Sequence, residues 1–217
     1  MAGTIKGDKR PRPGGHHLRR EVVVGYQRER ILGGAAAAIA AAGYRNVAVS
    51  DIVRSAAIAR ARFYENFASK EDCFLALFET ASDRSATVTR HACAELDSDF
   101  PTRVKTGIEA LLGYLGENPE QARACVVEGP AAGPPFGPFF EAMVARFVEM
   151  LQAARSHAEL EPLAETVEET VIGGLYWQIY YAILEVGPEG LASQADQLTE
   201  FALIPFIGPE AAHGAVS

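Results

Sequence analysis

The sequence predicts an all-α protein with two parts, a small N-terminal part of short helices and a larger part of longer helices. Apolar residues recur at the i, i+3, i+4, i+7 spacing of amphipathic helices along most of the chain. No segment alternates polar and apolar residues as a half-buried strand does. Breaks rich in Gly and Pro separate the helical patterns.

Opposite charges mark the two parts. Up to Lys70 the chain carries 13 Lys and Arg against 5 Asp and Glu, and from Glu71 onward it carries 7 against 23. The net charge of −8 therefore combines a basic part of +8 with an acidic part of −16. Such a division indicates that the basic part meets a polyanion, although a solvated basic arm without a partner has the same charge.

The N-terminal part begins with a segment that has nothing to bury. Residues 1–22 are rich in Gly, Pro and cations, which predicts a flexible basic arm. A helical pattern covers residues 23–42 and stops at Gly43, a typical C-cap. Short helices are predicted over 49–56 and 59–67, with two residues between them. Helices joined so tightly cross steeply, as in a helix-turn-helix.

Longer helical patterns follow residue 70, separated by Pro- and Gly-containing breaks. We therefore predict a helix-turn-helix domain of residues 23–70, a helical effector-binding and dimerisation domain of residues 71–208, and a flexible tail of residues 209–217. The helices expected in the larger domain are 71–96, 102–116, 119–127, 138–157, 164–186 and 193–206.

Composition excludes several classes of protein. Cys73, Cys93 and Cys125 lie far apart and outside any CxxC or Cys/His cluster, which indicates neither a disulfide framework nor a metal site. The longest apolar run, residues 171–184, is shorter than a membrane span, and the first 30 residues lack the apolar core of a signal peptide. We expect a cytoplasmic protein with no membrane partner and no cofactor.

The third predicted helix has an outward face suited to DNA. At 100° per residue, Phe63 and Phe67 point inward with Ala59. Ala61 and Glu65 point directly outward, and Arg62 and Tyr64 flank them. Arginine matches guanine in the major groove, Asn66 matches adenine, and Glu65 can accept from cytosine. A surface helix with solvated arginines is the alternative reading of the same pattern.

The segment ILGGAAAAIAAAGYRNVAVSDIVRSAAIARARFYENFASKED, residues 31–72, resembles the DNA-binding region of the TetR family of transcriptional regulators. The matching positions are Ile31-Leu32, Gly43-Tyr44, Val49, Asp51-Ile52, Ile58, Phe63-Tyr64, Phe67 and Ser69-Lys70-Glu71. The resemblance implies that Tyr64 and Lys70 contact phosphates and that positions 60, 61, 62, 65 and 66 face bases. The candidate DNA-binding residues are Arg45, Ala48, Arg60, Ala61, Arg62, Tyr64, Glu65, Asn66 and Lys70.

Three alanines depart from the family pattern, which usually has Thr or Ser near position 48, Gly at 57 and Ser at 59. Ala48 and Ala59 lack the hydroxyl of an N-cap, which is worth about 1 kcal/mol at each helix. Ala57 lacks the conformational freedom of Gly, so the turn either avoids positive φ or is strained there.

A homodimer is expected because one short helix contacts too few base pairs to be selective. The last two long helices, 164–186 and 193–206, are the candidate interface. Residues 170–186, TVIGGLYWQIYYAILEV, are apolar nearly all round, so they need cover on more than one side. The resemblance implies a four-helix interface from these two helices, and packing within one chain is the alternative.

Aromatic and Met side chains predict an effector pocket in the larger domain, with a few polar groups to orient the ligand. We expect a small-molecule effector that is uncharged or weakly polar, apolar or aromatic. Plain core packing explains the same spacing. The candidate ligand-binding residues are Tyr114, Glu128, Phe136, Phe140, Met143, Phe147, Trp177, Gln178 and Tyr181.

Together these features predict a ligand-responsive transcriptional regulator that binds double-stranded DNA. It would be a repressor released from a pseudo-palindromic operator by a small molecule. The three alanines leave a small-molecule-binding helical dimer with weak or lost DNA affinity as the alternative. The chain has no GxSxG, HExxH, Walker A or GxGxxG pattern, so we do not expect an enzyme.

Overall fold

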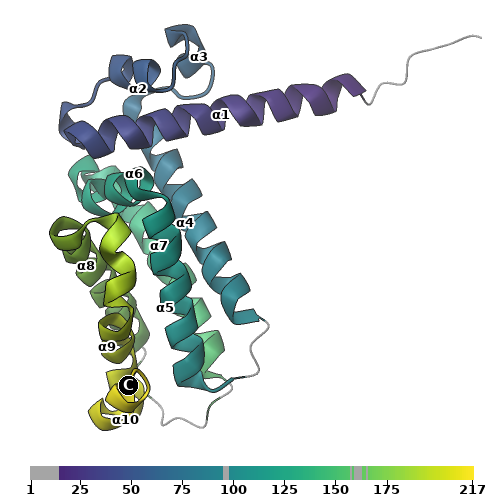
Figure 1. Cartoon of the computed structure of the whole chain (residues 1–217). Helices are drawn as coiled ribbons and strands as arrows, with labels where there is room; N and C mark the ends of the chain where they lie inside the picture. The colour runs from purple at the N-terminus through teal and green to yellow at the C-terminus, as the bar shows by residue number, and fades with distance from the viewer. Residues whose placement is uncertain (1–14, 95–97, 157, 159–162, 165) are drawn as a thin grey trace, which may run out of the picture.

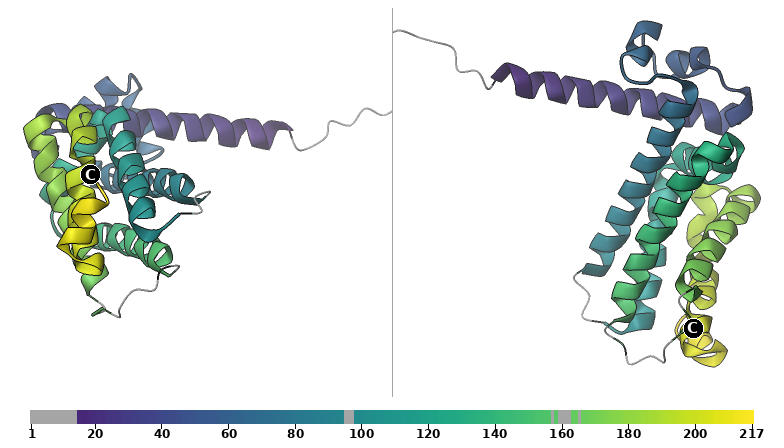
Figure 2. Two further views of the ribbon diagram at one scale, coloured as in Figure 1. Left: turned by 60° about the horizontal axis from the view of Figure 1, so that its bottom comes forward. Right: turned by 180° about the vertical axis from the view of Figure 1, so that it is seen from behind.

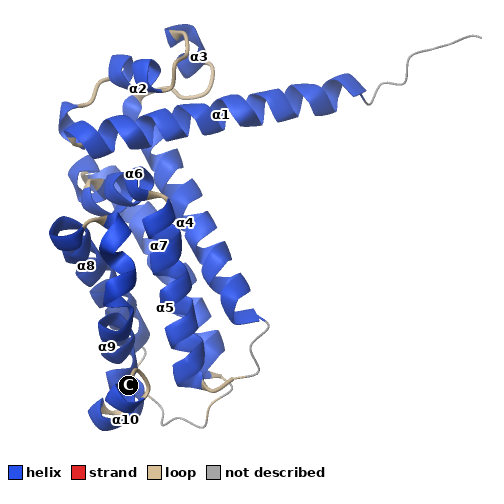
Figure 3. Ribbon diagram, viewed as in Figure 1, coloured by secondary structure: helices blue, strands red, loops and turns tan. Residues whose placement is uncertain are grey.

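The computed structural model describes residues 15–94, 98–156, 158, 163–164 and 166–217, and all regular elements in these ranges are helical (Figure 3). The all-α prediction is confirmed. The N-terminal elements are α1 (Gly15–Ala42), the 3-10 turn η1 (Tyr44–Asn46), α2 (Val49–Ser55) and α3 (Arg60–Tyr64). The C-terminal elements are α4 (Lys70–Ala94), α5 (Phe100–Glu117), α6 (Pro119–Ala122), η2 (Arg123–Val127), η3 (Gly129–Ala132), η4 (Pro134–Phe136), α7 (Gly137–Arg155), α8 (Val167–Val186), η5 (Pro188–Gln194), α9 (Ala195–Ile207) and α10 (Pro209–Gly214).

The helices form a small domain placed across one end of an elongated bundle. In Figure 1, α1 lies across the top, α2 and α3 stand on its outer side, and the longer helices extend below it. Seen from behind in Figure 2, α4 leaves the small domain and continues into the bundle beside α7. One helix therefore belongs to both domains, although the sequence placed a boundary at its first residue.

The core of the small domain collects the inward residues of four helices. Ile31 from α1, Ile52 from α2, Phe63 from α3 and Phe74 from α4 are all completely buried in one cluster. Burying each such side chain stabilises the fold by about 1.5–3 kcal/mol. Gly34 of α1 permits the close approach of the α2–α3 turn, because a Cβ there would lie 2.6 Å from the backbone nitrogen of Ala56.

The beginning of α1 differs from the prediction. The expected flexible arm, residues 1–22, lies mostly outside the described residues, but its last part is helical, since α1 begins at Gly15 rather than at residue 23. Leu, Arg and Glu, which fill much of residues 18–21, are good helix formers that can extend a helix already nucleated by its buried half.

Two further segments depart from the prediction. The helix expected over 119–127 divides into α6 and η2, a π-helical turn whose widened spacing appears in the hydrogen bond from the Glu128 nitrogen to the Arg123 carbonyl, 3.3 Å. Most of the tail expected to be flexible, 209–217, is helical instead, since α10 covers Pro209–Gly214. Ala212 is fully buried there, so packing against α9 holds α10 in place.

The larger domain has its own core, built mainly from α5, α8 and α9, with Leu112, Ile183 and Leu203 fully or almost fully buried. The ends predicted at Leu96 and His157 fall outside the described residues. Among the helices that the structure describes, none combines the length and apolarity of a membrane-crossing segment.

Candidate DNA-binding surface and ligand cavity

α3 presents its polar face away from the rest of the protein. Phe63 and Phe67, whose ring centroids lie 5.8 Å apart, anchor the helix in the core of the small domain. Arg60, Arg62 and Tyr64 lie on the opposite side and are exposed, with no later helix over them (Figure 1). α3 is shorter than the predicted 59–67. It covers Arg60–Tyr64 and has Glu65 as its C-cap.

The outward side chains hold one another in place. The Arg60 guanidinium donates to the Tyr64 hydroxyl at 3.1 Å, and Arg62 pairs with Glu65 at 2.6 Å. The Asn66 amide donates to the Arg62 carbonyl at 2.8 Å. Exposed ion pairs contribute little free energy, at most about 1 kcal/mol, so the arginines can exchange these partners for DNA at small cost. Ala61 is exposed among them and leaves room for close approach.

The two cations expected to grip phosphates have different surroundings. Arg45, on η1, is exposed. The Lys70 ammonium donates to the Tyr44 carbonyl at 2.7 Å and lies 4.2 Å from the centroid of the Tyr44 ring. Partial burial lowers the pKa of Lys70. Lys70 therefore ties the start of α4 to η1 and can reach a phosphate only with the hydrogen atoms that this bond leaves free.

Ala48 is the N-cap of α2 and has no side chain that can cap the helix. One half of a capping box is nevertheless present. The Ala48 N–H donates to the Asp51 carboxylate at 2.9 Å, which lowers the pKa of Asp51. The other half of the box needs a hydroxyl at position 48 and is missing. Ala59 likewise gives α3 no side-chain cap. No side chain therefore caps the backbone N–H groups in the first turn of either short helix.

The turn between α2 and α3 is strained. Ala57 has φ of 50°, the left-handed region, and it is the one non-Gly residue with positive φ in the described chain. This conformation costs an L-residue with a Cβ about 1–2 kcal/mol. Arg30 of α1 supports the turn by donating to the carbonyls of Ala56 and Ala57 at 2.8 and 3.0 Å.

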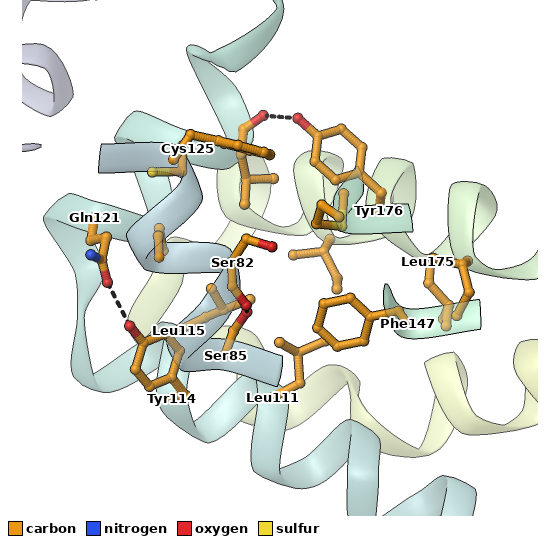
Figure 4. Close-up of a pocket in the computed structure, with 17 residues that line it drawn as sticks. Ser82, Ser85, Leu111, Tyr114, Leu115, Gln121, Cys125, Phe147, Leu175 and Tyr176 are labelled. Atoms are coloured by element: carbon orange, nitrogen blue, oxygen red, sulfur yellow. Dashed lines mark hydrogen bonds between the residues drawn. The ribbon is translucent and has the colours of Figure 1, made fainter. Parts of the chain in front are cut away.

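A cavity of about 100 Å³ lies inside the larger domain, between α4, α5, α7 and α8 and below η2 (Figure 4). Three of the predicted ligand residues line it: Tyr114 from α5, and Met143 and Phe147 from α7. The wall is otherwise almost entirely apolar. Ligand sites in proteins have this character, with a few polar groups placed among apolar ones.

Six predicted ligand residues do not line this cavity, and each has another structural place. Phe136 packs in the core of the small domain against Phe78, 4.7 Å between centroids, and Phe140 packs against Tyr176 at 4.8 Å. Glu128 binds the backbone of η1. The other three, Trp177, Gln178 and Tyr181, stand on sides of α8 that turn away from the cavity.

The α4 wall of the cavity was not predicted from the sequence. Ser82 and Ser85 line it, and Thr89 follows on the same face at the next turn. Small residues at i, i+3 and i+7 on a buried helix face leave volume unfilled, and this spacing could have pointed to the cavity. The remaining lining residues of note that were missed are Gln121, Cys125 and Tyr176.

The polar groups of the cavity are ordered by hydrogen bonds. Arg146 of α7 donates to the Ser82 hydroxyl at 2.7 Å and pairs with Asp83 at 2.8 Å. The Tyr114 hydroxyl donates to the Gln121 carbonyl oxygen at 2.8 Å (Figure 4). Burial raises the pKa of Tyr114 and that of the Cys125 thiol, the latter to about 12, so both remain neutral at physiological pH.

Contacts join the roof of the cavity to the small domain. Tyr176 in the cavity wall donates to the carbonyl of Val126 in η2 at 2.8 Å. Two residues further, the Glu128 carboxylate accepts the N–H of Tyr44 at 2.9 Å. The Tyr44 carbonyl also accepts a hydrogen bond from the Lys70 ammonium. The end of η2 and the start of α4 therefore both contact Tyr44 of η1.

A surface on α8 and α9 is apolar and exposed. Its large members are Trp177, Tyr181 and Leu184 of α8 and Ile204 of α9, which are 40–64% exposed. Gly173 adds open surface, since no atom lies within 4 Å of where its Cβ would stand, whereas Gly174 is packed against Phe201. We call these four side chains and Gly173 the α8–α9 face.

No group of three or more His, Cys, Asp or Glu side chains in the described residues is placed to hold a metal ion. The outward face of α3, the cavity and the α8–α9 face are therefore considered without a bound metal.

Comparison with known proteins places these sites in context. Residues 31–77 match the family model for bacterial regulatory proteins of the tetR family. The HTH-type transcriptional regulator EthR of Mycolicibacterium smegmatis is 27% identical over 105 residues. That alignment covers 48% of this chain and 48% of EthR, about half of each.

Solved structures resemble the fold over most of the chain. The fatty acid degradation regulator FadR of Bacillus halodurans superimposes with a TM-score of 0.72 at 18% identity, over 82% of this chain and 94% of its own. FadR of Bacillus subtilis, crystallised with stearoyl-CoA, gives 0.70 at 17% identity, over 80% and 96%. At these identities the likeness establishes a shared fold.

Proposed function

We propose that this chain, a DNA-binding transcriptional regulator of the tetR family of bacterial regulatory proteins, acts as a homodimeric repressor that a small molecule releases from its operator. The observation that carries the proposal is the placement of α3. Its polar face is fully presented to the outside, while its aromatic face is locked in the core of a domain that matches the family.

The reading surface would be the outward side of α3. Arg60, Arg62 and Asn66 can pair with base edges in the major groove, with Glu65 accepting from cytosine and Ala61 allowing close approach. Tyr64, Arg45 and Lys70 would contact phosphates, which position the helix without reading sequence. The N–H groups in the first turn of α2, which no side chain caps, add donors for phosphate.

The α8–α9 face supports a two-fold homodimer. Exposed Trp177, Tyr181, Leu184 and Ile204 form an apolar surface of the kind that buries against another protein. A second copy would place a second α3 on the next half-site of a pseudo-palindromic operator. Self-association through α8 and α9 therefore supplies the selectivity that one five-residue α3 lacks.

The cavity would hold the effector. Its neutral, apolar wall favours an uncharged or weakly polar molecule. The fold is shared with FadR of Bacillus subtilis, which binds stearoyl-CoA, so a hydrophobic effector is consistent with this likeness. The domain limits that fit this division of labour are residues 23–70 for DNA binding and 71–208 for effector binding and dimerisation, with DNA in the cytoplasm as the target.

A change at the cavity would reach the small domain through the contacts of η2 above the cavity. A ligand that displaces Tyr176 or Val126 shifts η2, and Glu128 then pulls on the Tyr44 backbone that Lys70 also holds. The effector needs only to bind the shifted arrangement more tightly than the DNA-competent one. The small domains of a dimer would then no longer match successive major grooves.

The test is binding of the purified protein to DNA from its own promoter region at several salt concentrations. We expect salt-dependent binding, and the double variant Arg60→Ala/Arg62→Ala should weaken it at least tenfold, since each base contact is worth about 1–3 kcal/mol. Arg90→Ala, an exposed arginine of α4 away from α3, is the matched control and should bind normally. The absence of any salt-dependent binding would refute the proposal.

A small-molecule-binding dimer with weak DNA affinity is the second candidate. It is favoured by one observation, the strained Ala57 beside two helices without side-chain caps. In that case the double arginine variant would behave like the unmodified protein in every assay. The family and the fold are those of regulators, and an enzymatic role has no further support.

A further inference from the structure

A second cavity, of about 90 Å³, adjoins the first inside the larger domain. It lies further along α4 from the small domain, where Thr89, Cys93 and Gly107 form part of its wall. Gly107 leaves this space open, because a Cβ there would sit only 3.4 Å from the Cys93 sulfur and from the methyl group of Thr89. Nothing described so far uses this cavity.

The two cavities share a wall. Leu111, Phe147, Ile172 and Leu175 line both of them, so these four side chains are what separates one space from the other. Figure 4 shows Leu111 and Phe147 beside each other in the first cavity. Both are long side chains that are only partly buried, and they can adopt another rotamer without breaking a hydrogen bond. A narrow ligand can therefore pass from one space to the other.

The combined shape is long and narrow. Each cavity has room for roughly seven to ten water-sized groups, which is too little for a bulky ring system. Placed end to end, the two spaces suit a single unbranched chain of roughly 13–19 such groups. Both walls are almost wholly apolar, so the part of the ligand inside them is hydrocarbon.

Polar recognition is concentrated in the first cavity. The Ser82 hydroxyl accepts from Arg146, and among the described residues its own proton has no acceptor, so it is free to donate into the cavity. The carbonyl oxygen of Gln121 accepts the hydrogen bond of the Tyr114 hydroxyl, so these two groups satisfy each other and Ser82 is the donor left for a ligand. No carboxylate or cation lines this cavity, so it offers a donor to a neutral acceptor and no counter-charge to an anion.

We propose that the effector of this protein is a straight-chain aliphatic carbonyl compound, of the class of esters and ketones, which occupies both cavities. Its carbonyl oxygen accepts from the Ser82 hydroxyl, and its chain passes between Leu111 and Phe147 towards Thr89. The inference rests on the proposed function only in calling this ligand an effector. Binding of the ligand can be measured without DNA.

The experiment is a calorimetric titration of the full chain with methyl esters of saturated acids from 6 to 16 carbons. We expect affinity to rise about fourfold per added methylene, the factor that corresponds to ~0.8 kcal/mol per buried CH₂, beyond the length that fills one cavity. The matching free carboxylates should bind at least tenfold more weakly. Affinity that stops rising at about eight carbons, or carboxylates that bind better than esters, would overturn the proposal.

Two methionines of α7 give a matched pair of blocked variants. Met143 lines only the first cavity and Met150 only the second. Met150→Trp should leave the six-carbon ester within twofold of the unmodified protein and abolish the gain for longer chains, whereas Met143→Trp should weaken all esters. Equal effects of both substitutions at every chain length would contradict two joined spaces.

A milder variant covers the case in which tryptophan disturbs folding. Ser82→Ala should weaken ester binding about three- to tenfold, because it removes one hydrogen bond, and an unchanged affinity would contradict the assigned role of Ser82.

Failure of the proposed function gives a different result from failure of the ligand assignment. If the esters bind as expected but do not release operator DNA, the release mechanism is wrong. If DNA binding is normal and no ester binds, the ligand class is wrong.

Discussion

The two halves of α4 pass through the protein's two domains and are packed in opposite ways. In the first half, Cys73, Phe74 and Leu77 are almost completely buried in a continuous core. In the second half, Ser82, Ser85 and Thr89 face the cavities on the corresponding side. One helix thus connects a close-packed DNA-binding unit with a unit that keeps internal space, and its side chains are smaller where the space remains.

The largest expected effect tests this difference in packing directly. Phe74→Ala should lower the free energy of unfolding by about 3–5 kcal/mol, because it empties a fully filled site. Phe147→Ala should cost roughly half as much, since part of that ring already borders empty space and has fewer contacts to lose. Urea unfolding curves measure both, and equal losses would show that the two halves are packed alike.

The contact between the domains comes next. Glu128→Ala should lower the free energy of unfolding by about 1.5–3 kcal/mol, because the Tyr44 N–H loses a charged acceptor in a partly buried place. The same variant should reduce the effect of any effector on DNA affinity while leaving effector binding itself nearly unchanged. Glu128→Gln keeps a neutral acceptor for the Tyr44 N–H, so its free energy of unfolding should lie between those of the unmodified protein and of Glu128→Ala. Unaltered release of DNA from Glu128→Ala would exclude this route between the domains.

Two neighbouring glycines of α1 sharpen the comparison within the small domain. Gly34→Ala should destabilise the protein by about 1–3 kcal/mol, since its Cβ would overlap the backbone of Ala56. Gly33→Ala meets no atom within 4 Å and should stabilise it by up to about 1 kcal/mol through helix propensity. Thermal unfolding of both variants should therefore shift in opposite directions.

The strained turn offers a smaller, stabilising change. Ala57→Gly should raise stability by about 0.5–1 kcal/mol, because relief of the left-handed strain exceeds the entropy that Gly adds to the unfolded chain. Ala56→Gly is the control, since Ala56 has an ordinary φ of −72° and should lose stability. If the strain also weakens DNA binding, the Ala57→Gly variant should bind DNA more tightly than the unmodified protein.

The smallest effect concerns pH, and it compares one helix start in each domain. Asp51 has its pKa lowered by the N–H of Ala48, and Asp99 has its pKa lowered by its hydrogen bonds from Thr102 at the start of α5. Each carboxylate stabilises the fold above its ordinary pKa of 3.8, and that contribution is lost as pH falls through the lower folded-state value.

Urea unfolding between about pH 5 and pH 2 measures this loss. Asp51→Ala and Asp99→Ala should each lower stability at neutral pH and flatten its decline in acid, and both should do so by similar amounts because both carboxylates are exposed. A decline that is just as steep in the two variants as in the unmodified protein would mean that other carboxylates dominate.

Sequence reasoning worked best where polarity and burial agree. The face of α3 was predictable because an aromatic stripe at Phe63 and Phe67 fixes which side chains point outward. The cavity was harder, because an apolar side chain that lines a space has the same sequence pattern as one that fills it. Phe136 and Phe140 were therefore predicted as ligand residues although they are core, and Ser82 and Ser85 were overlooked.

The remaining errors came from long-range packing. Glu128 looked like a polar group for a ligand, and only the fold places it next to Tyr44, 84 residues away. The helical end of the chain depends on Ala212 meeting α9, a contact with no local signal. Local patterns predicted the elements, whereas contacts between distant segments decided which polar residues were already occupied.

The π-helical turn of η2 has one geometric consequence. A π turn holds one residue more than an α turn, so re-forming it as ordinary helix would rotate everything beyond it by about 100° around the axis. Glu128 follows η2 directly and would swing off the Tyr44 backbone in a single slip of register.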